Sequence, residues 1–378
     1  MWTVKRIRSH FLHWKLTFLS FDQIHLLQDV TNRVPKQQNK NKDAEKRIAS
    51  APTDDRVIIR PRTNHNDVEA RAQDKISEAT VLIHMVIQNP GFAASRRNEV
   101  VEPKLRGYQH TGRTDDIDAR DADDVLSATS YVNDMYEYHR SKEIVTSPSP
   151  SYMDKHTSVN SRMREILIDW LVDVHYKFKM VPETLYLCVN VIDRFLERQT
   201  IARDKLQLVG VTALLLASKY EEIYPPSLSD LVHICDGAYN DREILKMEVS
   251  ILKTLKYNMT VPSAHVFLVR YLKAGHASRR IVQYASYILD STLQHYGLLE
   301  YLPSQLAAAA VMIARAKEQR HTWSPTLLKY TSYVEEDVIP VARTILSCMK
   351  GRGNHVDAVE RRYAHTRFGA VAGTEFYI

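Results

Sequence analysis

A mostly apolar helix is predicted by the stretch Met163-Arg164-Glu165-Ile166-Leu167-Ile168-Asp169-Trp170-Leu171-Val172-Asp173-Val174. At the helical period, the apolar side chains Met163, Ile166, Leu167, Trp170, Leu171 and Val174 share one broad face. Ile168 and Val172 extend the apolar character to a second side of the helix. A helix that is apolar on most sides lies inside a domain rather than on its surface. This stretch therefore predicts a helix buried in the middle of a domain.

Acidic residues form a second pattern in the same stretch. Glu165, Asp169 and Asp173 recur every four residues, so they form a single acidic stripe along the predicted helix. In angular position Asp173 lies beside Ile166 and Trp170, which places a carboxylate at the rim of an apolar strip. One interpretation is a core helix with one solvated edge. The other is a groove that takes an apolar side chain and pairs a neighbouring cation with Asp173.

Length and composition exclude several classes of protein. The chain has 378 residues, enough for two domains and a tail, and its hydrophobic content of 44% supports a sizeable core. The net charge of +6 is modest and the basic residues are spread out, so no direct binding to nucleic acid is expected. The longest apolar run, residues 206–217, is shorter than a membrane span, so no membrane association is expected either.

The cysteines give no sign of a metal site or of disulfides. Cys188, Cys235 and Cys348 are isolated from one another, and each lies within an apolar run. This distribution is typical of small buried residues in a reducing compartment. We therefore expect neither a metal nor a cofactor.

The N-terminal part of the chain lacks the periodicity of a packed domain. Residues 1–20 contain four basic and no acidic side chains, interleaved with aromatic ones. This is compatible with an amphipathic transit segment, although an unstructured basic tail is the preferred interpretation. Residues 31–124 are polar and charge-mixed, as expected of disorder. We therefore predict a disordered regulatory tail over residues 1–124.

Helix-start signals divide the region that follows the tail. Tyr131, Met135 and Tyr138 stand at the spacing of a short amphipathic helix ahead of the main body. Pro182 suits the first turn of the helix that follows residues 163–174. Residues 206–219 predict a third helix that is apolar nearly all round and central to its domain. The fourth and fifth helices begin at capping boxes, Ser227 with Asp230 and Asn240 with Glu243.

The sequence pattern of the predicted central helix recurs after residue 260. Residues 306–317 echo residues 208–219, since in both stretches small and apolar residues lead to a terminal lysine. Because an internal repeat changes the fold prediction, we predict an all-α protein of two tandem five-helix units, each of about a hundred residues. The predicted boundaries are 125–258 for the short helix and the first unit, 259–350 for the second unit and 351–378 for a C-terminal extension.

A set of short motifs runs through both predicted units. The longest is Ala217-Ser218-Lys219-Tyr220-Glu221-Glu222-Ile223-Tyr224-Pro225-Pro226. The others are Tyr131-Val132-Asn133-Asp134-Met135-Tyr136, Met163 to Trp170, Glu183-Thr184-Leu185-Tyr186, Ile192-Asp193-Arg194-Phe195-Leu196, Lys205-Leu206-Gln207-Leu208-Val209-Gly210, Val261-Pro262, the alanine run from Ala307, and Trp323-Ser324-Pro325. In combination they resemble the cyclin family, B-type mitotic cyclins in particular, over about two-thirds of the chain. The resemblance implies two tandem cyclin boxes, preceded by a short N-terminal helix and a disordered tail.

This resemblance implies a function. A cyclin is the activating, non-catalytic subunit of a cyclin-dependent kinase, here for control of the cell cycle at G2/M, in the nucleus and the cytoplasm. In the family, the first box and the N-terminal helix bind the regulatory helix of the kinase. A lysine that ends an apolar helix loses its solvation when a partner covers it, and it must then be paired. The positions implied are Lys219, Glu248, Tyr131, Met135, Tyr138 and Tyr220.

The resemblance also implies a surface for docking substrates. In the family this patch accepts Arg-x-Leu peptides of substrates and inhibitors, and it coincides with the groove inferred above from angular position. Because Asp173 stands where other cyclins have Glu or Gln, a preference for leucine is better supported than one for arginine. The tail departs from mitotic cyclins, since it contains neither Arg-x-x-Leu nor Lys-Glu-Asn. The docking residues implied are Met163, Ile166, Leu167, Trp170, Asp173, Leu206 and Gln207.

Two other functional classes fit the sequence less well. An enzyme needs a convergent set of side chains, but His175, His233, Asp193, Glu221 and Glu222 show no metal-ligand spacing, and there is no glycine-rich phosphate loop. We interpret Asp193-Arg194 and Glu221-Glu222 as ion pairs that fix helices. A cyclin-fold transcription adaptor, which grips DNA or a basal transcription factor, would normally show a zinc ribbon and a strongly basic face. This chain has neither.

Overall fold

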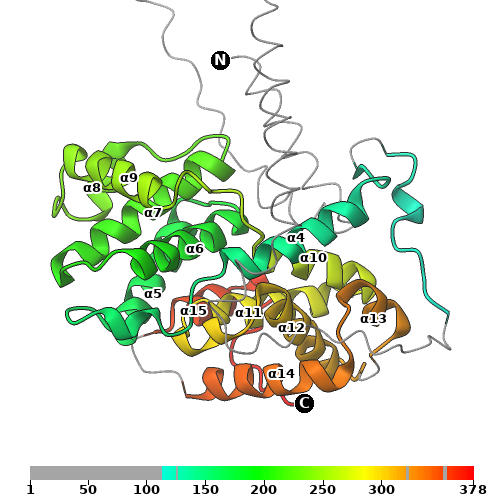
Figure 1. Ribbon diagram of the computed structural model, residues 1–378. Helices are drawn as coiled ribbons and strands as arrows, with labels where there is room; N and C mark the ends of the chain where they lie inside the picture. Colours follow the sequence, from blue (N-terminus) through cyan, green and yellow to red (C-terminus); the bar gives the residue numbers. More distant parts are fainter. Residues whose placement is uncertain (1–112, 125–126, 321–322, 352–355) are drawn as a thin grey trace, which may run out of the picture. The chain divides into compact units, whose positions relative to one another are not determined.

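The computed structural model of the protein describes residues 113–124, 127–320, 323–351 and 356–378. All regular secondary structure in these ranges is helical, which confirms the all-α prediction. The helices form two groups that follow one another along the chain (Figure 1). Most of the predicted tail, residues 1–112, lies outside the described ranges.

The first unit consists of five helices, one of which is central. Its helix α7 contacts α5, α6 and α9, and twelve residues of α7 are buried. Small residues in α7 permit this close packing: a Cβ atom at Gly210 would lie 2.7 Å from Cδ1 of Leu167 in α5. The predicted central helix is therefore confirmed. The helices are α5 (Ser161–Lys177), α6 (Pro182–Arg198), α7 (Leu206–Glu221), α8 (Leu228–Ile234) and α9 (Asp241–Thr254).

The second unit repeats this arrangement. Its central helix α12 contacts α10, α11 and α14, and the alanines at 307–310 are fully buried. This confirms the prediction of two tandem units, which rested on the echo between residues 208–219 and 306–317. The helices are α10 (Ala264–Ala274), α11 (Arg279–Thr292), α12 (Pro303–Lys317), α13 (Pro325–Thr331) and α14 (Glu335–Lys350).

Helix starts follow the predicted caps. The side chain of Ser227 accepts a hydrogen bond from the backbone N–H of Asp230, and the Asp230 carboxylate accepts one from the N–H of Ser227. Asn240 and Glu243 form the same reciprocal pair at the start of α9. Both capping boxes are confirmed. Short 3-10 helices complete the fold: η2 (Ala119–Asp121), η4 (Tyr152–Lys155), η5 (Arg203–Lys205), η6 (Tyr296–Glu300) and η7 (Thr366–Phe368).

The helix that precedes the first unit in sequence packs against the second unit. The hydroxyl of Tyr136 in α4 (Val132–Thr146) donates to a backbone carbonyl of α10 at 3.2 Å. Arg140 donates to the carbonyl of the last residue of α13 at 2.8 Å. The buried carboxylate of Glu143 accepts from both the backbone N–H and the hydroxyl of Ser304, at 2.9 and 2.7 Å. Polar contacts along its length therefore join α4 to the second unit.

The C-terminal extension packs on α5, the helix that contains residues 163–174. Its helix α15 (Ala358–Ala364) contacts α5 and α11. Asp169 of α5 is buried, and it accepts hydrogen bonds from Ala358 N at 2.8 Å and from Gln294 Nε2 at 2.7 Å. The interpretation of the acidic stripe as a solvated edge is therefore wrong at Asp169, because the extension covers that carboxylate.

Residues 113–124 also differ from the predicted disorder. Ile117 is buried, and Asp118 forms an ion pair of 2.6 Å with the buried Arg270 of α10. These two partners are 152 residues apart in the sequence. No local pattern of hydrophobicity conveys a contact over such a separation, which explains the difference.

Candidate functional site

A salt bridge lies at the end of the central helix of the first unit. Lys219 is in the last turn of α7, and its Nζ lies 2.5 Å from Oε1 of Glu248 in α9. The Lys219 side chain is 45% exposed and that of Glu248 is 13% exposed. The structure thus brings together the two residues predicted to contact a kinase. Because an exposed pair of this kind contributes only about 0–1 kcal/mol to stability, its weight as a contact depends on whether a partner covers it.

Exposed apolar side chains flank this salt bridge. Leu245 and Val249 lie on the same face of α9 as Glu248 and are 41% and 49% exposed. Ile223 and Tyr224 follow the end of α7, and Tyr224 is 90% exposed. Exposed large apolar side chains are typical of sites of interaction with other proteins. We define the α7–α9 surface by the salt bridge and by the exposed apolar residues that follow α7 or lie on α9, as Lys219, Ile223, Tyr224, Leu245, Glu248 and Val249.

The four apolar residues of this surface were absent from the predicted site. A signal for two of them was present in the sequence, since Leu245 and Val249 stand four residues apart and bracket Glu248. Ile223 and Tyr224 belong to the longest motif of the resemblance. Their exposure follows from the end of α7 at Glu221, which leaves them on an irregular segment.

The remaining predicted kinase contacts lie in two places. Tyr220 is half-buried, and its hydroxyl forms a hydrogen bond of 2.6 Å with Oγ1 of Thr260. Tyr131 and Tyr138 are exposed on α4, and Met135 between them is half-buried. The spacing of these three residues places them on the side of α4 that points away from the second unit.

The predicted docking residues divide into buried and accessible ones. Leu167 and Leu206 are each 6% exposed and belong to the core of the first unit. They can therefore form only the floor of a docking surface. Ile166 is 48% exposed. The half-buried ones are Met163, Trp170 and Gln207.

The acid at the rim of this surface already has a partner. Oδ2 of Asp173 accepts a hydrogen bond of 2.6 Å from Nη2 of Arg361 in α15. The same guanidinium group contacts Asp357. The cation that the groove interpretation requires is thus supplied by the chain itself. Because the Asp173 side chain is half-exposed and a carboxylate can accept from two cations, an arginine from another protein has to share Asp173 with Arg361 or displace it.

A buried ion pair ties α5 to α6 and to the second unit. Nε and Nη2 of Arg164 donate to the two carboxylate oxygens of Asp193 at 2.6 and 2.7 Å. The hydroxyl of Tyr152 donates to the same carboxylate at 2.8 Å, and Arg164 also donates to the carbonyl of Leu293 at 3.2 Å. Burial by itself would lower the pKa of Arg164. The charge of Asp193 and its hydrogen bonds raise this pKa by more, so the net shift is upward and the guanidinium stays charged.

The prediction that Asp193-Arg194 and Glu221-Glu222 form ion pairs that fix helices is confirmed for Asp193, which pairs with Arg164 of α5. Arg194 instead donates to a backbone carbonyl at 3.0 Å. The Glu222 carboxylate accepts hydrogen bonds from the N–H of Val181 and the hydroxyl of Thr184, at 2.8 and 2.5 Å. Glu222 therefore fixes the start of α6 by hydrogen bonding.

His175 of α5 makes the stability of the fold dependent on pH. Its ring is buried, and the Nε2 atom lies 2.8 Å from the carbonyl oxygen of Val181. In the neutral form of the ring, Nε2 carries the proton and donates a hydrogen bond to this oxygen. Burial, followed by the charge of Arg362, lowers its pKa from 6.5 to about 4. As the pH falls, His175 is therefore protonated at a higher pH in the unfolded chain than in the folded chain. Stability is complete above about pH 6.5 and declines toward pH 4, by up to about 3 kcal/mol.

Urea unfolding followed by circular dichroism, at pH values from about 7 to about 4.5, measures this decline. His175→Gln places an amide donor near the position of Nε2 but does not titrate, so its unfolding free energy should depend less on pH. A variant with the same pH profile as the unsubstituted chain would show that another group is responsible.

Within the described ranges, no group of three or more His, Cys, Asp and Glu side chains is arranged to hold a metal ion. None of the helices described is long and apolar enough to cross a membrane. A cavity of about 90 Å³ is lined by residues of both units, among them Asn190, Pro262 and Leu298. Its lining includes Arg164 and Asp193, which are already engaged with each other.

Two family models match the chain. The cyclin N-terminal domain matches residues 134–260, and the cyclin C-terminal domain matches residues 262–376. Together these matches cover the first and second units described above.

Curated relatives are similar over the same region. Cyclin-B2-1 of Oryza sativa subsp. japonica is 43% identical over 262 residues, which cover 69% of this chain and 62% of the relative. G2/mitotic-specific cyclin-2 of Medicago sativa is 42% identical over 263 residues, which cover 69% of this chain and 80% of the relative. The chain thus spans about six-tenths of the rice relative and four-fifths of the Medicago one.

A solved structure shares the fold. The crystal structure of a viral cyclin from herpesvirus saimiri aligns with a TM-score of 0.52 at 19% sequence identity. The alignment covers 57% of this chain and 96% of the viral one.

Proposed function

The chain belongs to the cyclin family, and from this membership we propose that it is the activating, non-catalytic subunit of a cyclin-dependent kinase. Its relatives named as B-type and G2/mitotic-specific cyclins support a role in cell-cycle control around the entry into mitosis. We further propose that it acts in the nucleus and the cytoplasm.

The α7–α9 surface carries this proposal. It combines a charged pair with four exposed apolar side chains, so a partner helix laid across it buries apolar area and removes water from Lys219 and Glu248. Such a surface activates by binding. If it fits the active arrangement of the kinase better than the inactive one, complex formation shifts the kinase toward the active arrangement.

Co-purification of the full chain with a cyclin-dependent kinase, followed by a histone-phosphorylation assay, tests the proposal. We expect a stable complex and a large rise in kinase activity over that of the kinase alone. A kinase that neither binds the chain nor gains activity from it would overturn the proposal. Titration with DNA at two salt concentrations separates the DNA-binding class, because a protein that grips phosphates shows a steep dependence on salt.

We also propose that the accessible part of α5 docks Arg-x-Leu peptides. Ile166 and the half-buried Met163 and Trp170 lie within two helical turns on one side of α5, above the buried Leu167. The burial of a leucine against them contributes about 1.5–3 kcal/mol. The arginine of the peptide contributes less, because Asp173 already pairs with Arg361.

Ile166→Ala tests this docking more cleanly than a change at Trp170, because Ile166 is exposed and contributes less to the core. We expect phosphorylation of a substrate that carries the docking motif to fall about tenfold, and that of a motif-free substrate to be unchanged. Ile378→Ala, which truncates another isoleucine of similar exposure outside both proposed surfaces, is the matched control. An equal fall for both substrates would contradict docking at this surface.

A further inference from the structure

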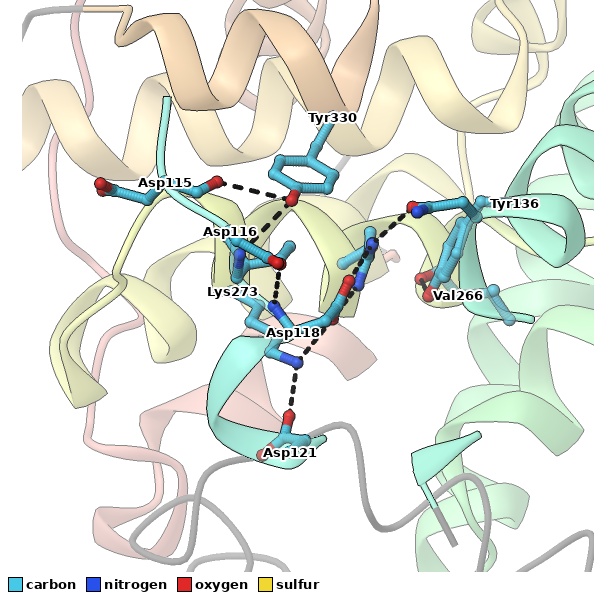
Figure 2. A network of polar contacts seen from close by, with 11 residues as sticks. Asp115, Asp116, Asp118, Asp121, Tyr136, Val266, Lys273 and Tyr330 are labelled. Carbon is cyan, nitrogen blue, oxygen red and sulfur yellow. Dashed lines mark hydrogen bonds and ion pairs between the residues drawn. The ribbon is translucent and has the colours of Figure 1, made fainter. Parts of the chain in front are cut away.

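An acidic segment, residues 113–124, lies against the second unit ahead of α4 (Figure 2). Its Asp118 carboxylate accepts hydrogen bonds from Nη1 and Nη2 of Arg270 at 2.6 and 2.7 Å. The same carboxylate accepts from Nζ of Lys273 at 2.9 Å, and Lys273 also reaches Asp121 at 2.6 Å. Both cations belong to α10, so a single helix of the second unit holds the acids of the segment.

The backbone of the segment is held as well. The N–H of Asp115 donates to Oγ1 of Thr326 at 3.1 Å, and the N–H of Ile117 donates to the hydroxyl of Tyr330 at 3.4 Å. Both acceptors belong to α13, and the side chain of Ile117 lies in the core of the second unit. The segment is therefore bound by α10 and α13 through charge, backbone hydrogen bonds and a buried apolar side chain.

Arg270 connects this segment to α4. Besides the two bonds to Asp118, its Nη2 donates to Oδ1 of Asn133 in α4 at 3.2 Å. Its guanidinium group lies 5.1 Å from the ring centroid of Tyr136, also in α4, and 4.8 Å from that of Tyr330. One buried cation thus contacts the acidic segment and two positions of α4 that are three residues apart.

The charge of Asp118 is needed to keep this cation in place. Burial raises the pKa of Asp118, but hydrogen bonds from Arg270 and Lys273 more than offset this, so the carboxyl has a lowered pKa and stays ionised. Without that charge, Arg270 and Lys273 would repel each other, and a buried cation would lack its main partner. Arg270 would then lose its hold on Asn133 and on the ring of Tyr136, which loosens the start of α4, although the Tyr136 hydroxyl still donates to α10.

We propose that residues 113–124 position α4 for kinase binding, with Asp118 and Arg270 as the positioning residues. This inference rests on the proposed function, in which Tyr131 and Tyr138 of α4 contact the kinase. A helix that is held in its binding orientation does not have to be ordered by the partner. If the released helix adopts this orientation only about a tenth of the time, the apparent affinity falls about tenfold.

The test compares Asp118→Asn with Asp123→Asn in the full chain. Asp123 is an exposed acid of the same segment, so it is a control with the same chemical change. Calorimetric titration with the kinase separates two effects, because unfolded protein lowers the stoichiometry whereas a misplaced α4 raises Kd. We expect Asp118→Asn to raise Kd about tenfold at unchanged stoichiometry, and Asp123→Asn to leave both unchanged.

Amide hydrogen exchange in the free chain supplies a second readout that does not involve the kinase. Residues 132–138 should exchange faster in Asp118→Asn than in the unsubstituted chain, while α12 keeps its protection. Unchanged exchange and unchanged Kd would overturn the proposal. Faster exchange with unchanged Kd would overturn it too, because α4 would then lie outside the kinase surface. The proposed function itself fails only if the unsubstituted chain does not bind the kinase.

Asn133→Ala keeps the proposal testable if Asp118→Asn does not fold. The Asn133 side chain is exposed, and its removal breaks the hydrogen bond from Arg270 to α4 but leaves the contact with Tyr136 and the ion pairs with Asp118 intact. We expect faster exchange of residues 132–138 and a smaller rise in Kd than for Asp118→Asn. Wild-type values of both quantities in a folded Asn133→Ala variant would contradict a role for Arg270 in holding α4.

Discussion

Arg164→Met is expected to lower the free energy of unfolding by about 3–5 kcal/mol. The substitution leaves the buried carboxylate of Asp193 with only the hydroxyl of Tyr152 as a donor, and it removes the bond from α5 to the carbonyl of Leu293. An uncompensated buried charge is far more costly than the loss of an exposed pair. Urea unfolding of the full chain, followed by circular dichroism, measures the difference.

Arg162→Met is the matched control for this prediction. Arg162 lies two residues earlier in α5, and its guanidinium forms an ion pair of 3.2 Å with Glu165 at the surface. Its removal should cost about 0–1 kcal/mol. The double variant Arg164→Met with Asp193→Leu should recover much of the loss, since an apolar pair can replace a buried ion pair. Equal effects of the two single substitutions would contradict the importance of burial.

Lys219→Ala is expected to weaken kinase binding by at least about tenfold and to leave the fold intact. Lys219 is about half-exposed in the free chain, so its contribution to stability is small. Once a kinase covers the α7–α9 surface, the ammonium group becomes part of a desolvated charged contact. The loss of one member of such a contact costs about 2–5 kcal/mol of binding free energy. Calorimetric titration measures the affinity, and thermal unfolding checks the fold.

The repeat in the chain offers a control for this experiment. Lys317 is the last residue of α12, and Lys219 lies in the last turn of α7. The Nζ of Lys317, however, donates to the carbonyl of Glu375 in the C-terminal extension at 2.9 Å. Lys317→Ala should therefore leave the affinity unchanged. The exchanged pair Lys219→Glu with Glu248→Lys should keep the salt bridge but not the binding, because the kinase meets reversed charges. Full affinity in the exchanged variant would show that the polarity of the pair is irrelevant.

The sequence alone predicted what local patterns determine. The apolar period located the helices, reciprocal side-chain caps located the starts of α8 and α9, and the echo between α7 and α12 predicted the two units. These features depend on residues only a few positions apart, so a single sequence contains them. The family resemblance named Lys219 and Glu248 as kinase contacts, but their salt bridge with each other was not predicted, because nothing local relates two residues on different helices.

Features that depend on distant partners could not be predicted. Asp173 was expected at the rim of a groove, but its partner Arg361 lies 188 residues further along the chain. Asp169 was placed on a solvated stripe, yet the C-terminal extension covers it. The polar composition of residues 113–124 predicted disorder. That prediction was wrong because the cations that stabilise this segment lie in α10, far along the chain. In each case a charged residue in an unremarkable local context is paired by the tertiary fold.

The attachment of α4 to the second unit has a consequence for the synthesis of the chain. The residues of the second unit that hold α4 and the segment before it lie 130 to 213 residues further along the chain. At about 5–20 residues per second, the ribosome needs on the order of 10–40 s to reach the end of α13 after it has made Arg140. During that interval the first unit can complete its own core, whereas α4 lacks the surface of the second unit on which it docks. A nascent chain would therefore carry a folded first unit and an undocked N-terminal helix, and the α4 part of the kinase surface would form last although it is translated first.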